Sequence, residues 1–244
     1  MNRDDTVPDT ADPDEAVPDD AVLDDPVGAS LRGRHAHLAR RLGRVATYQP
    51  EVATFSALPA DADEQDWHDL AKLLGPGAFA DLFSSPATPP KDWEPVFTLE
   101  GRQLVWSRPA PSPLPAQAVE LGASNVPEML DLVAKARPGP FWPRTHELGT
   151  YLGIRDADGA LVAMAGQRLR PPGWTEISAV CTAPEARGRG HAALLVTALV
   201  ARAVARGERP FLHVAETNTG AIALYERLGF ETRKPVTFRG FRTP

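Results

Sequence analysis

One stretch of this 244-residue chain, from Glu176 to Ala192, limits the possible folds more than any other. It begins with small and β-branched apolar residues, Ile177 to Cys181, which predict a short strand. A turn containing Gly188 and Gly190 follows, and apolar residues then recur at helical spacing from Leu194 to Ala205. Glycines let a backbone approach a phosphate closely, and the free N–H groups of a first helical turn attract anions. The stretch therefore predicts an anion-binding loop between a strand and a helix.

The spacing of the glycines separates this loop from two common phosphate-binding loops. The sequence contains neither the dinucleotide fingerprint G-x-G-x-x-G nor the P-loop G-x-x-x-x-G-K-[ST]. It has Arg187-x-x-Gly190-x-Ala192 instead. A second motif, from Asn218 to Phe230, reads NTGAIALYERLGF and follows a predicted strand at Phe211 to Val214. The separation of the two motifs fits one helix and one strand.

Together, the two motifs resemble those of the GCN5-related N-acetyltransferases. The first resembles their [QR]-x-x-G-x-[GA] acetyl-CoA loop, and the second resembles their N-x-x-A-x-x-[LF]-Y-x-[KR]-[LF]-G-F signature. The strand before the loop, EISAVCT, is similar to that of the FR47-like branch. The resemblance runs from Leu148 to Phe230 and, more weakly, back to Ala118. It implies an α/β fold with a mixed sheet, the acyl-CoA N-acyltransferase fold, in the C-terminal half.

The resemblance also implies an activity. The expected reaction is transfer of an acetyl group from acetyl-CoA to a primary amine by direct attack in a ternary complex, with no metal. A small amine or an amino acid is the first acceptor class, and a protein N-terminus or a lysine is the second. The alternative is a non-catalytic CoA-binding or regulatory module, and the presence of both Glu176 and Tyr225 argues against it.

Individual residues receive roles from the same resemblance. The backbone of the strand would hold the pantetheine arm, and the Val180 N–H, beside a local bulge, would donate to the thioester oxyanion. Tyr225 would be the general acid that protonates the CoA thiolate. The residues expected to bind acetyl-CoA are Val180, Cys181, Thr182, Arg187, Gly188, Arg189, Gly190, His191, Ala192, Asn218 and Tyr225.

Glu176 is the first candidate for the general base. Strand alternation puts it on the same side as Val180, about 13 Å away, so it would act through a water or through the curve of a bulged strand. The same alternation turns Cys181 away, which disfavours an acetyl-cysteine intermediate. His213 is the second candidate base, although it also fits a packed core histidine.

A proline- and glycine-rich loop, residues 137–144, follows a predicted helix from Val126 to Ala136. In the family that the chain resembles, this region forms one wall of the acceptor site. Phe141, Trp142 and Arg144 are therefore candidates for acceptor binding. A surface turn with a tucked-in aromatic side chain explains the same residues equally well.

The chain divides into four predicted segments. Residues 1–30 hold ten acidic residues and one arginine and are expected to be a disordered tail; a solvated leader is favoured over a partner tether or a competitor for the CoA site. Residues 31–108 read as a smaller α/β domain, interpreted as a degenerate copy of the acetyltransferase fold. Spaced prolines in residues 109–116 predict a stiff linker. Residues 117–244 form the expected acetyltransferase domain.

Two further expectations concern the first half. Residues 31–42 have leucines at helical spacing and predict an amphipathic helix with a basic outer face. Its arginines leave nucleic-acid binding open as a third function, although a solvated basic face is favoured because no binding motif accompanies them. These arginines are Arg32, Arg34, Arg40, Arg41 and Arg44. Two short strands at 96–99 and 103–106, with a turn at Glu100-Gly101, predict a hairpin.

Composition sets the remaining bounds. A single cysteine excludes an internal disulfide framework, and no histidine pattern predicts a metal site. No apolar run approaches the roughly 20 residues of a membrane span, and no apolar signal region stands at the N-terminus. The expected protein is therefore cytoplasmic, without a membrane partner, and a monomer or homodimer.

Overall fold

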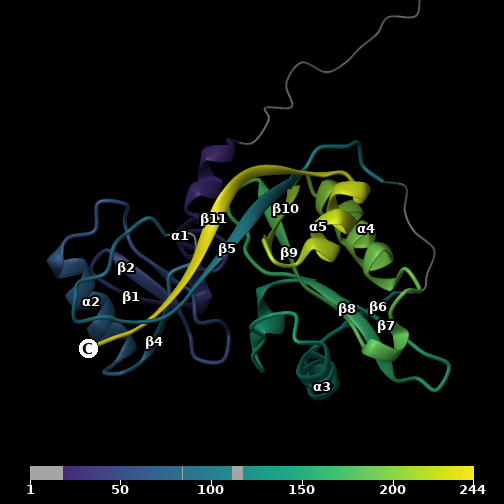
Figure 1. The fold of residues 1–244 in the computed structure, drawn as a ribbon, viewed down its shortest axis with the longest axis horizontal. Helices are drawn as coiled ribbons and strands as arrows, with labels where there is room; N and C mark the ends of the chain where they lie inside the picture. Colours follow the sequence, from purple (N-terminus) through teal and green to yellow (C-terminus); the bar gives the residue numbers. More distant parts are fainter. Residues whose placement is uncertain (1–18, 84, 112–117) are drawn as a thin grey trace, which may run out of the picture.

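The computed structural model of the chain describes residues 19–83, 85–111 and 118–244. They form one large mixed sheet and one small sheet with helices packed on them (Figure 1). The eight strands of the large sheet lie in the order β4-β11-β5-β10-β9-β8-β7-β6, and β9 and β10 are its parallel pair. Their bounds are β4 Phe79–Asp81, β5 Glu94–Trp106, β6 Val119–Leu121, β7 Tyr151–Arg155, β8 Leu161–Gln167, β9 Trp174–Thr182, β10 Arg209–Ala215 and β11 Phe230–Arg242. The predicted α/β fold with a mixed sheet is confirmed.

Three helices cover the part of this sheet that carries the sequence motifs. They are α3 (Val126–Ala136), α4 (His191–Val204) and α5 (Thr219–Leu228). In Figure 1, α3 lies on one side of the strands and α4 and α5 lie on the other. The apolar face of α4 packs fully into the core through Leu195 and Leu199, as helical spacing requires. The helix predicted from Val126 to Ala136 and the strands predicted around the motifs are present.

The first half of the chain builds a small antiparallel sheet, β1 (Ala39–Leu42), β2 (Val45–Tyr48) and β3 (Ser56–Ala57), with α1 (Pro26–Arg32) and α2 (Glu64–Leu74). The prediction of a helix over residues 31–42 was wrong. Gly33 ends α1, a short 3-10 helix η2 (Ala36–Leu38) follows, and Gly43, at a φ of +54°, turns β1 into β2.

The prediction of disorder was wrong for residues 20–30. Asp20–Asp24 form the 3-10 helix η1, and α1 follows directly. Leu23 and Val27 are fully buried in a cluster that also contains Trp174 and Phe211 of the second half. Burial of these apolar residues outweighs the acidic composition of the segment. The rest of the predicted tail, residues 1–18, lies outside the described residues.

The hairpin predicted at Glu100-Gly101 was also wrong, because β5 runs straight through it. Gly101 lies where β5 passes between β10 and β11: a Cβ atom there would stand 2.7 Å from the Val214 carbonyl oxygen and 2.4 Å from the Phe238 ring. The glycine therefore permits close packing of strands and does not form a turn.

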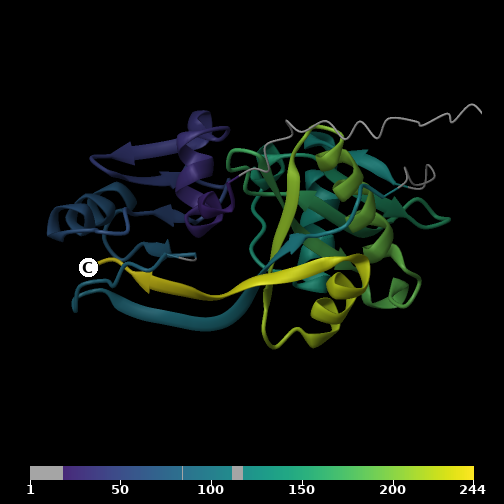
Figure 2. The same ribbon diagram turned by 90° about the horizontal axis from the view of Figure 1, so that it is seen from above.

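The long pair β5 and β11 forms a ribbon that spans the molecule, as Figure 2 shows from above. One end of the ribbon pairs through β5 with β10 of the second half, and the other end pairs through β11 with β4 of the first half. The predicted boundary at residues 109–116 therefore separates strands that belong to a single sheet. Residues 112–117 themselves are outside the described part.

The order of elements in the two halves is parallel. Each half has a helix, three antiparallel strands, a second helix and a strand with a parallel contact, in this order. In the first half these are α1, β1 to β3, α2 and β4; in the second half they are α3, β7 to β9, α4 and β10. In the first half the parallel contact is the bridge between Phe55 and Asp81. The segment before α2, residues 58–63, contains two aspartates and no glycine, so it offers no phosphate loop. The interpretation of the first half as a degenerate copy stays a prediction.

No helix within the described ranges combines the length and the apolar character needed to cross a bilayer.

Substitution of Gly101 tests the close packing of the ribbon. We expect Gly101→Ala to lower the free energy of unfolding by about 1–3 kcal/mol, because the added methyl group meets a backbone carbonyl that cannot move freely. Gly122→Ala is the matched control: its Cβ meets nothing within 4 Å, and the change should stay within about 0.5 kcal/mol. Urea unfolding curves measure both, and equal midpoints would contradict the packing argument.

Candidate active site

A cavity of about 880 Å³ opens where β9 and β10 part. The two strands pair only from Arg209–Phe211 to Trp174–Glu176, and beyond this point β9 continues to Thr182 on its own side of the gap. The motif loop and the start of α5 close one end of the cavity, and side chains of the first half and of the β5–β11 ribbon close the other. The divergence of two parallel strands therefore creates the space between the halves.

A β-bulge lies at the point of divergence, as the resemblance to the acetyltransferases implies. Ser178 pairs with Gly166 and Cys181 pairs with Met164, so that Ala179 and Val180 together oppose one residue of β8. Ala179 has a φ of +52°, a left-handed conformation that is uncommon for a residue with a side chain. Both bulge residues line the cavity.

The bulge corrects the predicted side-chain alternation. Because of the extra residue, Ser178 and Cys181 face the same side of the sheet, and the even spacing from Glu176 to Val180 no longer holds. Cys181 is nevertheless buried in the core, and burial raises the pKa of its thiol to about 12. A thiol in this state is a poor nucleophile, which agrees with the rejection of an acetyl-cysteine intermediate.

The motif loop after β9 is shaped for a phosphate group. Gly188 and Gly190 both have a φ of +78°, and Gly190 is the N-cap of α4. The free N–H groups of the first turn of α4 stand at this cap. Arg187 and Arg189 are exposed, and all residues from 187 to 192 line the cavity. Such an arrangement of backbone N–H groups, helix dipole and arginines binds a diphosphate.

The start of α5 brings two further predicted residues to the cavity. Asn218 is the N-cap of α5 and accepts a hydrogen bond from the Ala221 N–H at 3.2 Å. Tyr225, further along the same helix, is 8% exposed, and burial raises its pKa to about 12. Its phenol therefore keeps its proton at neutral pH and can donate it. Both residues line the cavity.

Glu176 has surroundings that sequence alone did not reveal. It is fully buried and is not among the residues lining the cavity. Its carboxylate accepts hydrogen bonds from Arg168 Nε at 2.8 Å and Nη2 at 2.6 Å, from His213 Nδ1 at 2.7 Å and from the Leu169 N–H at 3.2 Å. Burial alone would raise the pKa of Glu176, but the Arg168 charge and these hydrogen bonds outweigh it and lower the pKa to about 2. Such a carboxylate is a weak proton acceptor, which weighs against Glu176 as the general base; its role in the reaction stays a prediction.

His213 is held from both sides. Its Nε2 lies 3.0 Å from the amide nitrogen of Gln103, which also donates to the Leu23 carbonyl oxygen at 2.9 Å. Because this amide can only donate, Nε2 of His213 accepts and its Nδ1–H donates to Glu176. Burial lowers the pKa of His213 more than the Glu176 carboxylate raises it. The imidazole is neutral and has both nitrogens occupied, which leaves it poorly placed to act as a base.

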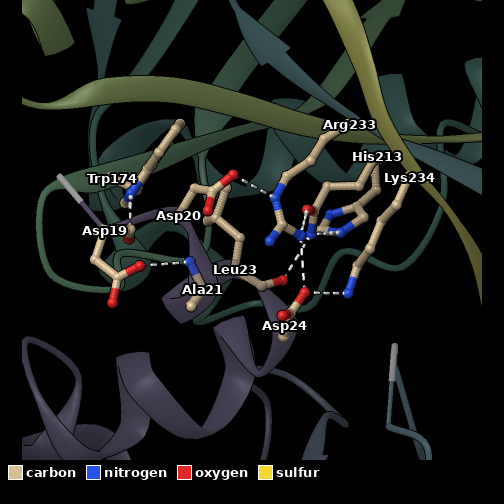
Figure 3. A network of polar contacts seen from close by, with 10 residues as sticks. Asp19, Asp20, Ala21, Leu23, Asp24, Trp174, His213, Arg233 and Lys234 are labelled. Atoms are coloured by element: carbon tan, nitrogen blue, oxygen red, sulfur yellow. Dashed lines mark hydrogen bonds and ion pairs between the residues drawn. The ribbon is translucent and has the colours of Figure 1, made fainter. Parts of the chain in front are cut away.

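A surface network continues from this point to η1 (Figure 3). Arg233 donates to Gln103 Oε1 at 3.0 Å, to Asp24 at 2.8 Å and to Asp20 at 3.2 Å. The segment predicted as a disordered acidic tail therefore helps to hold the Gln103 side chain in contact with Nε2 of His213.

Comparison with known proteins agrees with this geometry. The family model described as FR47-like protein matches residues 151–238. The chain is also 37% identical to a solved putative acetyltransferase of the GNAT family from Novosphingobium aromaticivorans, over 91% of this chain and 98% of that one, with a TM-score of 0.83. This chain belongs to the GNAT family. A GCN5-related N-acetyltransferase from Kribbella flavida, 19% identical, shares the fold over 89% of this chain and 94% of its own with a TM-score of 0.58. No curated protein matches the chain. Membership of this GNAT family supports acyl transfer as the general reaction.

The three residues predicted to bind the acceptor of this GNAT chain lie outside the cavity lining. Phe141 is buried against Tyr151, with ring centroids 5.5 Å apart, and Trp142 is 40% exposed. Arg144 is paired with Glu147 at 2.7 Å. None of these three candidates lines the cavity; residues 136–140, directly before them, do. Arg137, in a left-handed conformation, ends α3, and the loop that starts there lines the cavity through residue 140.

The first half of this GNAT chain contributes to the cavity, which its sequence did not lead us to expect. Phe55, Asp81 and Phe83 line the cavity opposite the motif loop, together with Phe97 and Phe238 of the ribbon. The alternation Phe79-x-Asp81-x-Phe83 was a readable signal, because it places a carboxylate between aromatic residues in a strand. Only the tertiary structure brings it to the motif loop.

The five arginines of residues 32–44 all contact other residues of the chain. Arg32 pairs with Asp25, Arg44 pairs with Asp66, and Arg34 reaches Glu208 at 3.3 Å. Arg40 donates to the Leu73 carbonyl oxygen, and Arg41 donates to that of Leu31. These contacts favour a structural role for the arginines over nucleic-acid binding.

Removal of the Glu176 charge tests how much the buried ion pair with Arg168 contributes to stability. We expect Glu176→Gln to lower the free energy of unfolding by about 3–5 kcal/mol at pH 7, because Arg168 is left as an uncompensated buried charge. The folded-state pKa of Glu176 is depressed, so its stabilisation is present above the ordinary value of 4.5 and is lost as pH falls through about 2. The difference between variant and wild type should therefore shrink over that range.

The control for this variant is Glu120→Gln. Glu120 pairs with Arg202 at 2.6 Å, but both side chains are largely exposed, and its loss should cost less than about 1 kcal/mol. Denaturant unfolding at pH 7 and pH 3 compares the two variants. A similar loss of unfolding free energy in both variants would show that the buried ion pair stabilises the protein no more than the exposed one.

Proposed function

We propose that this GNAT protein is an acetyl-CoA-dependent N-acetyltransferase that acetylates a primary amine of a small molecule or amino acid. The observation that carries the proposal is the convergence of the glycine loop, the Ala179 bulge and Tyr225 on one cavity. Each of the three supplies a different requirement of acyl transfer. A protein N-terminus or a lysine side chain is the second acceptor class.

The residues of the cavity suit acetyl-CoA. Backbone N–H groups at Gly188, Gly190 and the first turn of α4 would hold the diphosphate, and the exposed arginines 187 and 189 would add charge. The unpaired edge of β9 from Val180 to Thr182 would hydrogen-bond the pantetheine arm as a neighbouring strand would. The cavity volume of about 880 Å³ lies within the usual range for small-molecule sites, roughly 300–1,000 Å³.

The chemistry follows from the same residues. A neutral amine nitrogen attacks the thioester carbonyl carbon, the N–C bond forms, and the C–S bond breaks. The Val180 N–H would donate to the oxygen that becomes negative, and Tyr225 would donate its proton to the leaving thiolate. The proton that the amine nitrogen loses as the amide forms would return to the Tyr225 phenolate. The Cys181 thiol takes no part, because its raised pKa keeps it protonated.

Gly190 tests the predicted phosphate loop. We expect Gly190→Ala to weaken acetyl-CoA binding at least about tenfold, because a side chain there strains the left-handed N-cap and obstructs the diphosphate. Gly207→Ala is the matched control: Gly207 has a similar φ of +70°, also meets nothing within 4 Å, and is not among the cavity-lining residues. Calorimetric titration with acetyl-CoA measures both. Failure of the wild-type chain to bind acetyl-CoA would reject the proposed function.

Tyr225 tests the proton transfer. We expect Tyr225→Phe to lower kcat about 100-fold and to leave the Kd of acetyl-CoA unchanged, because only the acidic proton is removed. Tyr151→Phe is the control, since this buried tyrosine lies outside the cavity lining and its hydroxyl has no hydrogen-bond partner in the described part of the chain. Thiol release in the presence of an amine gives kcat. A non-catalytic CoA-binding module would show no amine-dependent release in the wild type.

A further inference from the structure

An unusual carboxylate stands at the end of the cavity opposite the motif loop. Asp81 is 4% exposed, yet it lines the cavity. Its Oδ2 lies 3.5 Å from the Thr54 hydroxyl, and its Oδ1 is buried without any hydrogen-bond partner among the described residues. A buried unsatisfied carboxylate is costly, and at a cavity wall it marks a place where a ligand group completes the hydrogen bonding.

A glycine on the neighbouring strand makes room for aromatic rings beside Asp81. Asp81 pairs with Gly240 of β11, and Gly240 pairs on its other side with Phe97 of β5. A Cβ atom at Gly240 would stand 2.5 Å from the Phe97 ring and 2.6 Å from the Phe79 ring. The glycine therefore lets the aromatic rings of neighbouring strands lie over the sheet beside the carboxylate.

Aromatic rings form the walls around this end of the cavity. Phe83 stacks on Phe238 with centroids 4.9 Å apart and packs against Phe55 at 5.0 Å. Arg168 is the charged group that acts on Asp81, and it lies over the Phe55 and Phe83 rings. Its ion pair, however, is with Glu176, at 2.6 Å. The Asp81 carboxylate is thus left free for another cation.

The protonation of Asp81 fits an exchange of protons near neutrality. Burial raises the pKa of its carboxyl to about 7, against the opposing effects of Arg168 and the Thr54 hydroxyl. A base with a pKa near the working pH can accept a proton and release it again at little cost in free energy. Glu176, held by Arg168 and His213, cannot do this.

We propose that Asp81 binds the ammonium group of the acceptor and takes its proton, and that the surrounding phenylalanines select an acceptor with an apolar body. This proposal rests on the proposed acetyl transfer. In the step, one N–H bond of the ammonium breaks and its proton passes to the Asp81 carboxylate, which leaves a neutral amine. The amine then forms the N–C bond while the C–S bond breaks, and Tyr225 protonates the thiolate. The second proton that the nitrogen loses as the amide forms passes to the Tyr225 phenolate, and the proton on Asp81 is released to solvent.

The charges of the cavity set a limit on the acceptor. Asp81 is the one acidic residue among the lining residues in the described ranges, and several arginines line the same cavity. These arginines are Arg137, Arg168, Arg187, Arg189 and Arg227. A single positive charge can pair with Asp81, whereas a second positive charge on the acceptor finds no further carboxylate among the described lining residues. The acceptor class is therefore an apolar monoamine and not a polyamine.

The first test is binding. The full-length chain with saturating CoA is titrated with 2-phenylethylamine and with spermidine at pH 8. We expect wild type to bind 2-phenylethylamine at one site and spermidine at least tenfold more weakly. Asp81→Asn should weaken 2-phenylethylamine binding at least tenfold and leave acetyl-CoA binding unchanged. Asp61→Asn, which removes an exposed carboxylate of the same half, is the control and should bind as wild type does.

The second test is the pH profile of acetyl transfer. We expect kcat/KM of the wild type to fall on the acid side with an apparent pKa near 7, and Asp81→Asn to be about 100-fold slower without this limb. Thermal unfolding checks that the variant is folded. Because the folded-state pKa of Asp81 is raised, its charge destabilises the protein increasingly from pH 4 to pH 7. Asp81→Asn should therefore have a higher Tm than wild type at pH 8 and an equal Tm near pH 4.

The outcomes separate the two proposals. Absence of acetyl-CoA binding rejects the acetyltransferase function itself. Binding of acetyl-CoA without binding of 2-phenylethylamine, or equal amine binding by Asp81→Asn and wild type, overturns the role of Asp81 alone. Tighter binding of spermidine than of 2-phenylethylamine overturns the assigned acceptor class.

Discussion

The buried ion pair between Arg168 and Glu176 is the contact on which the site depends. Glu176 lies on β9 at the last residue that pairs with β10, and Arg168 stacks on Phe55 and Phe83 of the first half. His213, on β10, donates to the same carboxylate. One carboxylate therefore connects both parting strands and both halves of the chain. Removing two charges from water has a large cost, and the hydrogen bonds around Glu176 offset it.

The β5–β11 ribbon explains why the first half belongs to the active site. Each half ends in one strand of the ribbon, and that strand pairs with the other half: β5 with β10, and β11 with β4. The halves are therefore linked by strand exchange and do not merely touch. Phe97 and Phe238, which the ribbon carries, and Asp81, at its far end, reach a cavity whose phosphate loop lies in the second half. This arrangement gives the two ends of the cavity different origins in the sequence.

The two ends also differ in chemistry. The loop end is made of glycines, helix N–H groups and arginines, which suit a phosphate-bearing acyl donor. The opposite end is made of phenylalanines around a single carboxylate, which suits a cationic apolar acceptor. The bulge at Ala179 lies between them and marks the place where donor and acceptor would meet.

Local sequence patterns were sufficient to predict the elements of the second half and the glycine loop between β9 and α4. These elements depend on contacts between residues close in sequence, which leave local patterns of spacing and turn residues. They are the glycine loop, the strand before it, the helices at 126–136 and 219–228, and the position of Tyr225 on the second of these helices. The remaining features depend on tertiary contacts. Four features arise from residues far apart in the sequence. They are the straight course of β5 through Gly101, the ordered structure of residues 20–32, the hydrogen bonds that hold Glu176, and the position of Asp81 at the cavity. A carboxylate's function is set by its surroundings: Arg168 and His213 lower the pKa of Glu176, whereas burial without a partner raises the pKa of Asp81. No local pattern distinguishes these two cases.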